Sequence, residues 1–181
     1  GSIEVRCVLA QDRLSQLERH LALFFTGFSR TASEIASEQM KVTPNKKAEL
    51  MKMMELTNEA EAIITDPARP LDDFGRLMHE SWKIKRSLTS KISNSHIDEI
   101  YEAGLGAGAL GGKLLGAGGG GFMLFYVSPE RRKELRARLK HLLCVPFSFS
   151  SKGSHVVVYE PEETYDQTVV EERSAVYAQR V

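Results

Sequence analysis

The sequence predicts an α+β domain in which helices cover an antiparallel or mixed sheet. Three observations lead to this fold class. Strand-like segments occur near both ends of the chain, a long stretch between them carries apolar residues at helical spacing, and a continuous apolar segment follows a run of glycines. We therefore expect one domain at 3–160, with a helical insertion in its sheet, and a polar tail at 161–181.

The first elements are expected to be two strands separated by a short helix. Residues 3–9 alternate apolar and polar side chains, as a strand with one buried face does. Residues 12–20 fit a helix that turns Leu14 and Leu17 inward. Residues 21–27 form an apolar run that ends in glycine, which predicts a central strand buried on both faces.

Three helices should follow and form the insertion. The first has apolar residues recurring between 32 and 40 and ends by Pro44, and the second covers 45–65. The third is expected over 71–92, with one apolar stripe facing the core. Its predicted buried stripe consists of Leu77, Ser81, Ile84 and Leu88.

The second half of the chain should return to the sheet. Ser95 is a predicted N-cap with Asp98 three residues later, and this helix gives way to small residues by Gly111. After a glycine loop, Phe122–Val127 should be a second buried central strand. The remaining predicted elements are a helix opened by Ser128 and final strands at 145–150 and 155–159.

The composition is that of an ordinary globular protein and excludes several function classes. The 181 residues are 42% hydrophobic and 27% charged, and Lys+Arg and Asp+Glu balance at 24 each. The balance predicts neither a nucleic-acid nor an anionic-membrane partner, and no apolar run approaches the roughly 20 residues of a membrane span. Cys7 and Cys144 form no disulfide or metal-ligand pattern, so we expect no metal site and a reduced, cytoplasmic compartment. Gly1-Ser2 is typical of a cloning remnant, from which we expect the chain to be a fragment.

The glycine-rich segment does not match the common nucleotide-binding motifs. The pattern G-x-G-x-x-G occurs twice, at 106–111 and 116–121, but a dinucleotide site needs a strand before the glycines and a helix after them. Here a helix precedes the glycines and a strand follows. The phosphate loop of P-loop proteins needs Ser or Thr after its lysine, and Leu114 follows Lys113. Two interpretations stay open: close packing of a helix on the sheet, or close approach of a ligand.

Three separated motifs resemble those of a known family. Gly-Ala-Leu-Gly-Gly-Lys-Leu-Leu-Gly-Ala-Gly-Gly-Gly-Gly-Phe at 108–122 resembles the third signature motif of GHMP kinases, the family of galactokinase, homoserine kinase and mevalonate kinase. Phe25–Ile35 and His79–Leu88 resemble the sugar-phosphate branch, typified by D-glycero-D-manno-heptose 7-phosphate kinase. The resemblance covers about Ile3 to Tyr159. It implies the family's C-terminal domain, which is a ferredoxin-like, mostly antiparallel sheet with several helices.

The resemblance implies the substrate-side half of an ATP-dependent kinase for a sugar or sugar phosphate. GHMP kinases bind ATP and Mg²⁺ mainly on an N-terminal domain, through a loop resembling Pro-x-x-x-Gly-Leu-Gly-Ser-Ser-Ala that this sequence lacks. The usual catalytic acid belongs to that domain too, so no catalytic residue is assigned here and the chain alone should be inactive. The expected partners are the N-terminal domain, the sugar or sugar phosphate, and a second copy. The alternative is a stand-alone small-molecule-binding or dimerisation module that shares the fold without kinase activity.

The candidate binding residues combine the glycine loop with nearby cations. A bare glycine loop can direct successive N–H groups at an anion, and cations at helix starts or on a helix face can hold a sugar phosphate. For each cation, the competing interpretation is a solvated surface position. We expect at least one of Arg30, Lys83 and Arg86 to face the same cleft as Gly118. The full set is Gly116, Ala117, Gly118, Gly119, Gly120 and Gly121 in the loop, with Ser29, Arg30, Lys83, Arg86 and Lys113.

Overall fold

The computed structural model describes residues 9–27, 32–150 and 156. The chain divides into two compact units, Gly1–Phe149 and Ser150–Val181, and the first contains every helix and strand among the described residues. The strands predicted at 3–9 and 155–159 fall almost entirely outside the described residues.

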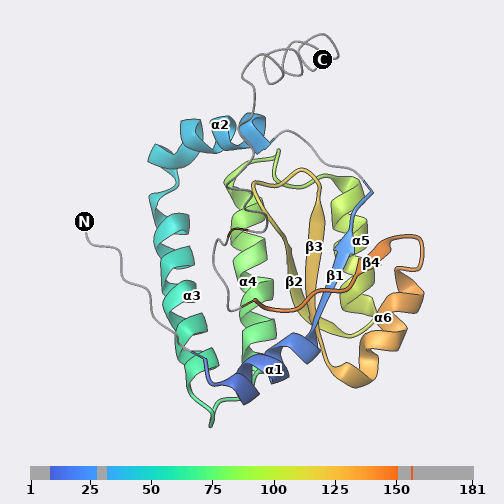
Figure 1. Ribbon diagram of the computed structural model, residues 1–181. Helices are drawn as coiled ribbons and strands as arrows, with labels where there is room; N and C mark the ends of the chain where they lie inside the picture. Colours follow the sequence, from blue (N-terminus) through green and yellow to red (C-terminus); the bar gives the residue numbers. More distant parts are fainter. Residues whose placement is uncertain (1–8, 28–31, 151–155, 157–181) are drawn as a thin grey trace, which may run out of the picture. The chain divides into compact units, whose positions relative to one another are not determined.

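One antiparallel sheet forms the centre of the first unit (Figure 1). Its 4 strands stand in the order β2-β3-β1-β4, and each neighbouring pair is antiparallel. Leu23 in the middle of β1 faces Leu124 on one side and Val145 on the other. Both apolar segments predicted to be central strands, β1 and β3, therefore lie inside the sheet. The strands are β1 (Leu21–Phe25), β2 (Ala109–Leu114), β3 (Phe122–Val127) and β4 (Leu143–Val145).

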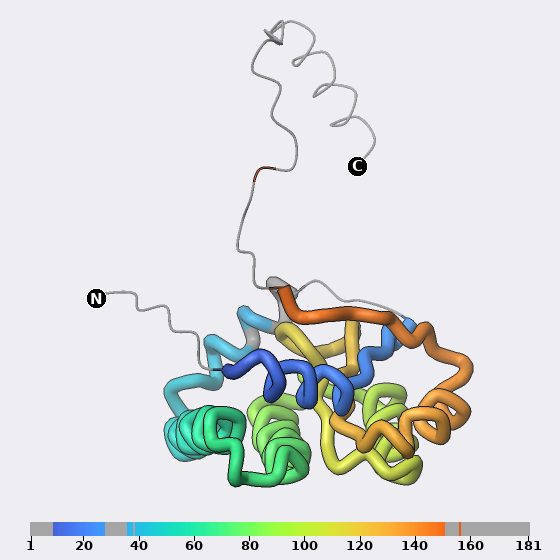
Figure 2. The backbone as a smooth tube through the Cα atoms, turned by 60° about the horizontal axis from the view of Figure 1, so that its bottom comes forward, coloured from blue at the N-terminus to red at the C-terminus, as the bar shows by residue number. Residues whose placement is uncertain are grey.

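The helices flank the sheet and include the predicted insertion of three helices, α2, α3 and α4, between β1 and α5. Figure 2 shows α3 and α4 as neighbours on one flank and α5 with α6 on the other. In the described part of the chain, none of the helices combines the length and the apolar character that crossing a bilayer requires. The helices are α1 (Gln11–His20), α2 (Ala32–Val42), α3 (Lys47–Thr65), α4 (Asp72–Leu88), α5 (Ser95–Gly106) and α6 (Arg132–Arg138), with 3₁₀ turns at Thr43–Asn45 and Pro129–Arg131.

One apolar cluster packs on each face of the sheet, because successive residues of a strand point to opposite sides. Phe125 joins a cluster with Trp82 and residues of α5 and α6, whereas its neighbour Tyr126 joins a cluster with Met78 and Leu17. Helix α4 contributes to both clusters, since it lies along the edge strand β2. The alternation along β3 thus places one long helix within reach of both faces.

The buried stripe of α4 differs from the one predicted. The buried residues are Gly75, Met78 and Trp82, so the helix is rotated relative to the sequence-based expectation. A Cβ on Gly75 would touch the ring of Tyr126, and a Cβ on Gly111 of β2 would touch Gly75 O. The helix therefore turns its glycine toward the strand, a preference that counting large apolar residues cannot detect. The four residues of the predicted stripe are only partly buried: Leu77, Ser81, Ile84 and Leu88.

Strand β2 was not predicted, because two glycines in six residues indicate a loop rather than a strand. The same two glycines let the strand fit between its neighbours, α4 and β3. Gly111 leaves room for the backbone of α4, and Gly112 leaves room for Leu124 O and the ring of Phe125. The helix that precedes β2 ends at Gly106, and the glycine loop begins only after Leu114.

Two element boundaries also differ from the prediction. The N-cap of α5 is Asn94 rather than Ser95, and its side-chain oxygen accepts a hydrogen bond of 3.0 Å from the N–H of Ile97. The strand predicted at 145–150 is instead β4, which starts two residues earlier, at Leu143, and stops before Pro146. Proline has no N–H, so it cannot continue the ladder with β1.

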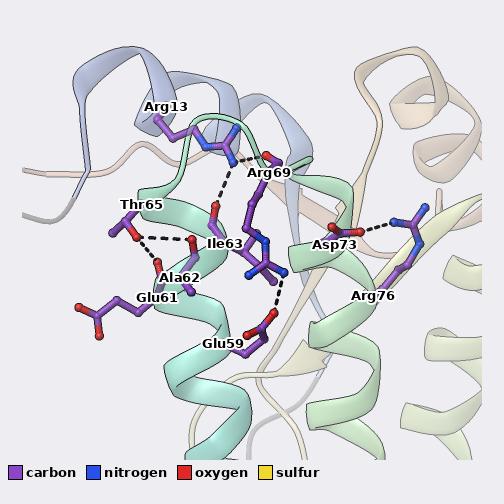
Figure 3. A network of polar contacts seen from close by, with 9 residues as sticks. All are labelled: Arg13, Glu59, Glu61, Ala62, Ile63, Thr65, Arg69, Asp73 and Arg76. Carbon is purple, nitrogen blue, oxygen red and sulfur yellow. Dashed lines mark hydrogen bonds and ion pairs between the residues drawn. The ribbon is translucent and has the colours of Figure 1, made fainter.

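A polar network joins α1 to the turn between α3 and α4 (Figure 3). The guanidinium Nη2 of Arg13 donates to the carbonyl oxygens of Ile63 at 3.0 Å, Asp66 at 3.2 Å and Arg69 at 2.6 Å. Arg69 in turn pairs with Glu59 at 2.6 Å. Carbonyls at a helix C-terminus have no partner within their own helix, so Arg13 satisfies groups that the α3–α4 hairpin leaves open.

We expect Gly104→Ala to destabilise the domain by about 1–3 kcal/mol, because a Cβ there would overlap the buried ring of Phe125. Gly106→Ala, on the same helix, is the matched control. A Cβ at Gly106 meets nothing within 4 Å and should stabilise the helix by about 0.5–1 kcal/mol. Urea denaturation of both variants measures the difference, and equal midpoints would contradict the packing of α5 on β3.

Candidate functional site

The loop between β2 and β3, residues 115–121, has a backbone that only glycine adopts easily. Every glycine in it has a positive φ, whereas Ala117 does not. Residues with a side chain would be strained at these positions. The glycines therefore give the loop a path that other residues would adopt only with strain. The φ values are 73° for Gly116, 124° for Gly118, 76° for Gly119, 157° for Gly120 and 108° for Gly121.

The middle of the loop lies against the backbone of the α4–α5 connection. A Cβ on Gly118 would stand 2.8 Å from Ile92 Cα and 2.9 Å from Ile92 O. The N–H of Gly119 donates to the same carbonyl oxygen at 2.8 Å. At Gly118, glycine thus permits close packing of two backbone segments.

The far end of the loop is attached to the end of β1. Buried Thr26 accepts a hydrogen bond of 3.0 Å at Oγ1 from the N–H of Gly121, and its own N–H donates to Gly121 O at 2.8 Å. A ring nitrogen of His96, in the first turn of α5, lies 3.1 Å from Thr26 O. Strand β1, helix α5 and the loop therefore meet at one end of the sheet, the upper end in Figure 1.

Two side chains hold the beginning of the loop by its carbonyl oxygens. The Nζ of Lys85, on α4, donates to Leu114 O at 3.1 Å and to Gly116 O at 2.6 Å. The Nε2 of Gln39, on α2, donates to Ala117 O at 3.0 Å. Helices α2 and α4 thus both restrain the first half of the loop.

Several loop N–H groups have no hydrogen-bond partner in the described part of the chain. Among the described residues, none accepts a hydrogen bond from the N–H of Gly116, Ala117, Gly118 or Gly120. Gly118 and Gly120 are nevertheless buried residues, and buried N–H groups without partners are rare in proteins. Successive free N–H groups form an anion-binding surface, so this loop can bind a phosphate or carboxylate.

Lys85 was not identified from the sequence, although it lies between two residues that were. Burial, and to a smaller extent the positive charge of Lys113, lower the pKa of the Lys85 ammonium group to about 8. In the described part of the chain no carboxylate forms an ion pair with it. The signal for Lys85 was its position three residues after buried Trp82, on the same helix face.

The structure gives the cations predicted on α4 other partners. Lys83 is exposed and stands 3.4 Å from Glu80 on its own helix. Arg86 pairs with Asp98 of α5 at 2.9 Å, and the same carboxylate oxygen accepts a bond of 2.7 Å from Ser93. Arg86 thereby supports the segment on which the glycine loop rests. Ser29 and Arg30 lie outside the described residues.

Lys113 lines a separate, mostly apolar cavity of about 330 Å³. The cavity lies between the sheet and helices α1, α3 and α4, and its other polar side chains are Thr57 and Ser81. No group of three His, Cys, Asp or Glu suited to a metal ion occurs among the residues that the structure describes. The described donors around the glycine loop are backbone N–H groups and the side chains of Thr26, Gln39 and Lys85.

Comparisons with known proteins agree with these features. The family model "GHMP kinases C terminal" matches residues 53–143, half of the chain. The chain is 32% identical over 145 residues to D-glycero-alpha-D-manno-heptose 7-phosphate kinase of Campylobacter jejuni, covering 77% of this chain and 42% of the relative. It is 30% identical over 144 residues to the bifunctional fucokinase/GDP-fucose pyrophosphorylase of Arabidopsis thaliana, covering 76% of the chain and 13% of the relative.

The solved structure of a mevalonate kinase has a similar fold, with a TM-score of 0.62 and 25% identity. The similarity covers 76% of this chain and 42% of that one. The chain thus spans less than half the length of each of these relatives.

The loop geometry predicts different costs for two similar substitutions. Gly116→Ala should cost about 1–2 kcal/mol, the strain of a side chain at positive φ, because its Cβ would meet nothing within 4 Å. Gly118→Ala adds a collision with the Ile92 backbone, and we expect about 1–3 kcal/mol more. Thermal or urea unfolding tests the order, and a smaller cost at Gly118 would contradict the packing on Ile92.

Stability should depend on pH through Lys85. Its folded pKa of about 8 lies below the ordinary 10.5, so below pH 8 the amine is charged in both states and its burial cost is fully present. Between about pH 8 and 10.5 the unfolded chain binds more protons, and the free energy of unfolding should rise with pH relative to Lys85→Met. Urea denaturation at several pH values measures this difference. Lys133→Met, which removes an exposed lysine of α6, should follow the wild type, and parallel curves for Lys85→Met would refute the assignment.

Proposed function

The chain belongs to the GHMP kinase family, whose C-terminal domain it matches over residues 53–143, and on this premise we propose that it forms the substrate-side half of an ATP-dependent kinase. The acceptor is a sugar or a sugar phosphate. The nucleotide-binding half is proposed to lie outside this chain, since the heptose 7-phosphate kinase relative extends well beyond the 42% that aligns.

The observation that carries this proposal is the glycine loop, in which the N–H groups of Gly116, Ala117, Gly118 and Gly120 have no partner among the described residues. Phosphoryl transfer is catalysed mainly by positioning the groups and stabilising their charge. Fixed N–H dipoles stabilise charge without having to reorganise during the reaction. A loop that is held at both ends and still has unpaired N–H groups at Ala117 and Gly118 suits a transferring phosphate.

ATP and Mg²⁺ are the cofactors that this activity requires. When bound, ATP supplies the phosphoryl group, and the loop N–H groups are the part of this chain that would contact it. The described residues contain no carboxylate cluster for a metal ion. Mg²⁺ commonly keeps several waters and binds one or two carboxylates together with substrate phosphates, so we assign its protein ligands to the nucleotide-binding domain.

We further propose an anionic acceptor of the heptose 7-phosphate kind. The support is the 32% identity to the Campylobacter jejuni heptose 7-phosphate kinase over 77% of this chain. Among the described candidates, Arg86 is held by Asp98 and Lys83 lies beside Glu80, whereas Lys113 forms no ion pair with a described residue. Lys113 and, from the sequence, Ser29 and Arg30 are therefore the proposed contacts for the acceptor phosphate.

One observation favours the alternative of a dimerisation module. Helices α2 and α3 expose a set of apolar side chains that a second copy of the chain would bury. The exposed residues are Met40 at 69%, Leu50 at 37%, Met51 at 57% and Met54 at 63%. This surface is compatible with kinase activity as well, so it does not replace the first proposal.

An ADP-release assay with a panel of sugars and sugar phosphates tests the function. The protein in which this chain follows an ATP-binding domain should turn over with a sugar phosphate, and omitting the acceptor should abolish ADP release above background. Residues 3–181 alone should show no activity, because the sequence lacks the triphosphate loop. Sustained acceptor-dependent turnover by residues 3–181, or no turnover by the longer protein with any acceptor, would overturn the proposal.

A further inference from the structure

Two side chains from different helices donate hydrogen bonds to neighbouring carbonyl groups of the glycine loop. Lys85 of α4 donates to Gly116 O at 2.6 Å, and Gln39 of α2 donates to Ala117 O at 3.0 Å. Neither contact lies within a helix or a strand ladder, and each bridges segments that are far apart in the sequence. In both contacts the acceptor is the carbonyl oxygen of a loop peptide group, and the N–H of the same peptide group stays open.

These two hydrogen bonds determine the direction of two loop N–H groups. In a trans peptide the C=O group and the N–H group of the next residue point in opposite directions, and the described backbone contains no cis peptide. Since Lys85 holds Gly116 O, the N–H of Ala117 points away from α4. Since Gln39 holds Ala117 O, the N–H of Gly118 points away from α2. These are two of the loop N–H groups that have no partner among the described residues.

We propose that Lys85 and Gln39 are positioning residues, which hold the loop so that the Ala117 and Gly118 N–H groups face the phosphoryl group being transferred. This inference rests on the kinase function proposed above and adds two side chains to its site. Neither residue needs to touch the substrate. Each acts through one peptide group, by keeping its carbonyl oxygen on the protein side.

The partners of Lys85 suit a positioning role, because they are loop and strand carbonyl oxygens and not a surface carboxylate. Its ammonium group also donates to Leu114 O at 3.1 Å, so it spans the end of β2 and the first glycine of the loop. No described carboxylate forms an ion pair with it, so carbonyl oxygens are its partners. Lys113 is the neighbouring charge on β2. A hydrophobic residue of the same length would fill the space and leave both carbonyl oxygens unpaired.

The first test follows the loop directly, with no requirement for activity. The protein is labelled with ¹⁵N-glycine, and the amide signals of Gly116 and Gly118 are compared in the wild type, Lys85→Met, Lys85→Arg and Gln39→Met. The signals should move in both Met variants and return toward the wild type in Lys85→Arg, since arginine can also donate to two carbonyls. Arg76→Met is the control, because this residue of α4 is exposed and, among the described residues, its ion-pair partner is Asp73 of the same helix.

The second test uses the kinase that contains this chain, with ATP and the sugar phosphate that supports turnover. Lys85→Met and Gln39→Met should each lower kcat at least tenfold and leave the KM for ATP within about twofold, and Lys85→Arg should restore part of the rate. A purely structural role would instead lower the active fraction in proportion to the loss of folded protein, which circular dichroism measures. Arg76→Met should keep the wild-type kcat.

The outcomes separate this inference from the function on which it rests. Unchanged Gly116 and Gly118 signals in Lys85→Met and Gln39→Met would overturn it, as would wild-type kcat in both variants. A loss of rate that Lys85→Arg does not relieve would also count against it. If the wild-type protein phosphorylates nothing, the kinase proposal and the catalytic part of this inference fall together. The glycine signals then still decide whether Lys85 and Gln39 hold the loop.

Discussion

The close approach of α4 to the edge strand β2 is the contact on which the rest of the structure depends. Gly75 and Gly111 meet there, and a Cβ on Gly111 would collide with Gly75 O and stand 2.7 Å from His79 N. Without side chains between them, the helix and the strand lie closer than bulky residues would permit. This closeness lets Met78 and Trp82 reach the apolar clusters on opposite faces of the sheet.

The same contact also places α4 beside the glycine loop, so that the helix can hold it. Because α4 follows β2 to its end, Lys85 arrives where the strand stops and can hold Leu114 O and Gly116 O. Further restraints come from Gln39, the Ile92 carbonyl and Thr26, each on a different segment. The glycine-rich loop is therefore held by tertiary contacts. The positive φ values that glycine permits make the path accessible, and the contacts select it.

Membership of the GHMP kinase family gives this arrangement its context. The described residues offer backbone N–H groups and amines at the loop, and no cluster of metal ligands. Such a surface can position and neutralise a phosphate, whereas the nucleotide and its metal require donors from another domain in the function we propose. Arg86 and Asp98 take part indirectly, since their ion pair supports the segment that carries Ile92.

The sequence by itself determined the α+β class, the two central strands β1 and β3 and the helical insertion. These follow from local properties: periodicity along one segment and continuous apolar runs. The family was indicated by the resemblance of three separated motifs, and the family model confirms it. Only the tertiary structure decided the rotation of α4, the identity of β2 and the part played by Lys85. Each of these depends on which two surfaces meet. In the sequence a glycine indicates a break in a strand, and only the fold shows that the backbone of α4 lies against Gly111 of β2. A lysine between Ile84 and Arg86 likewise looks solvated in the sequence, and only the fold brings it to Leu114 O at the end of β2 and to Gly116 O in the loop.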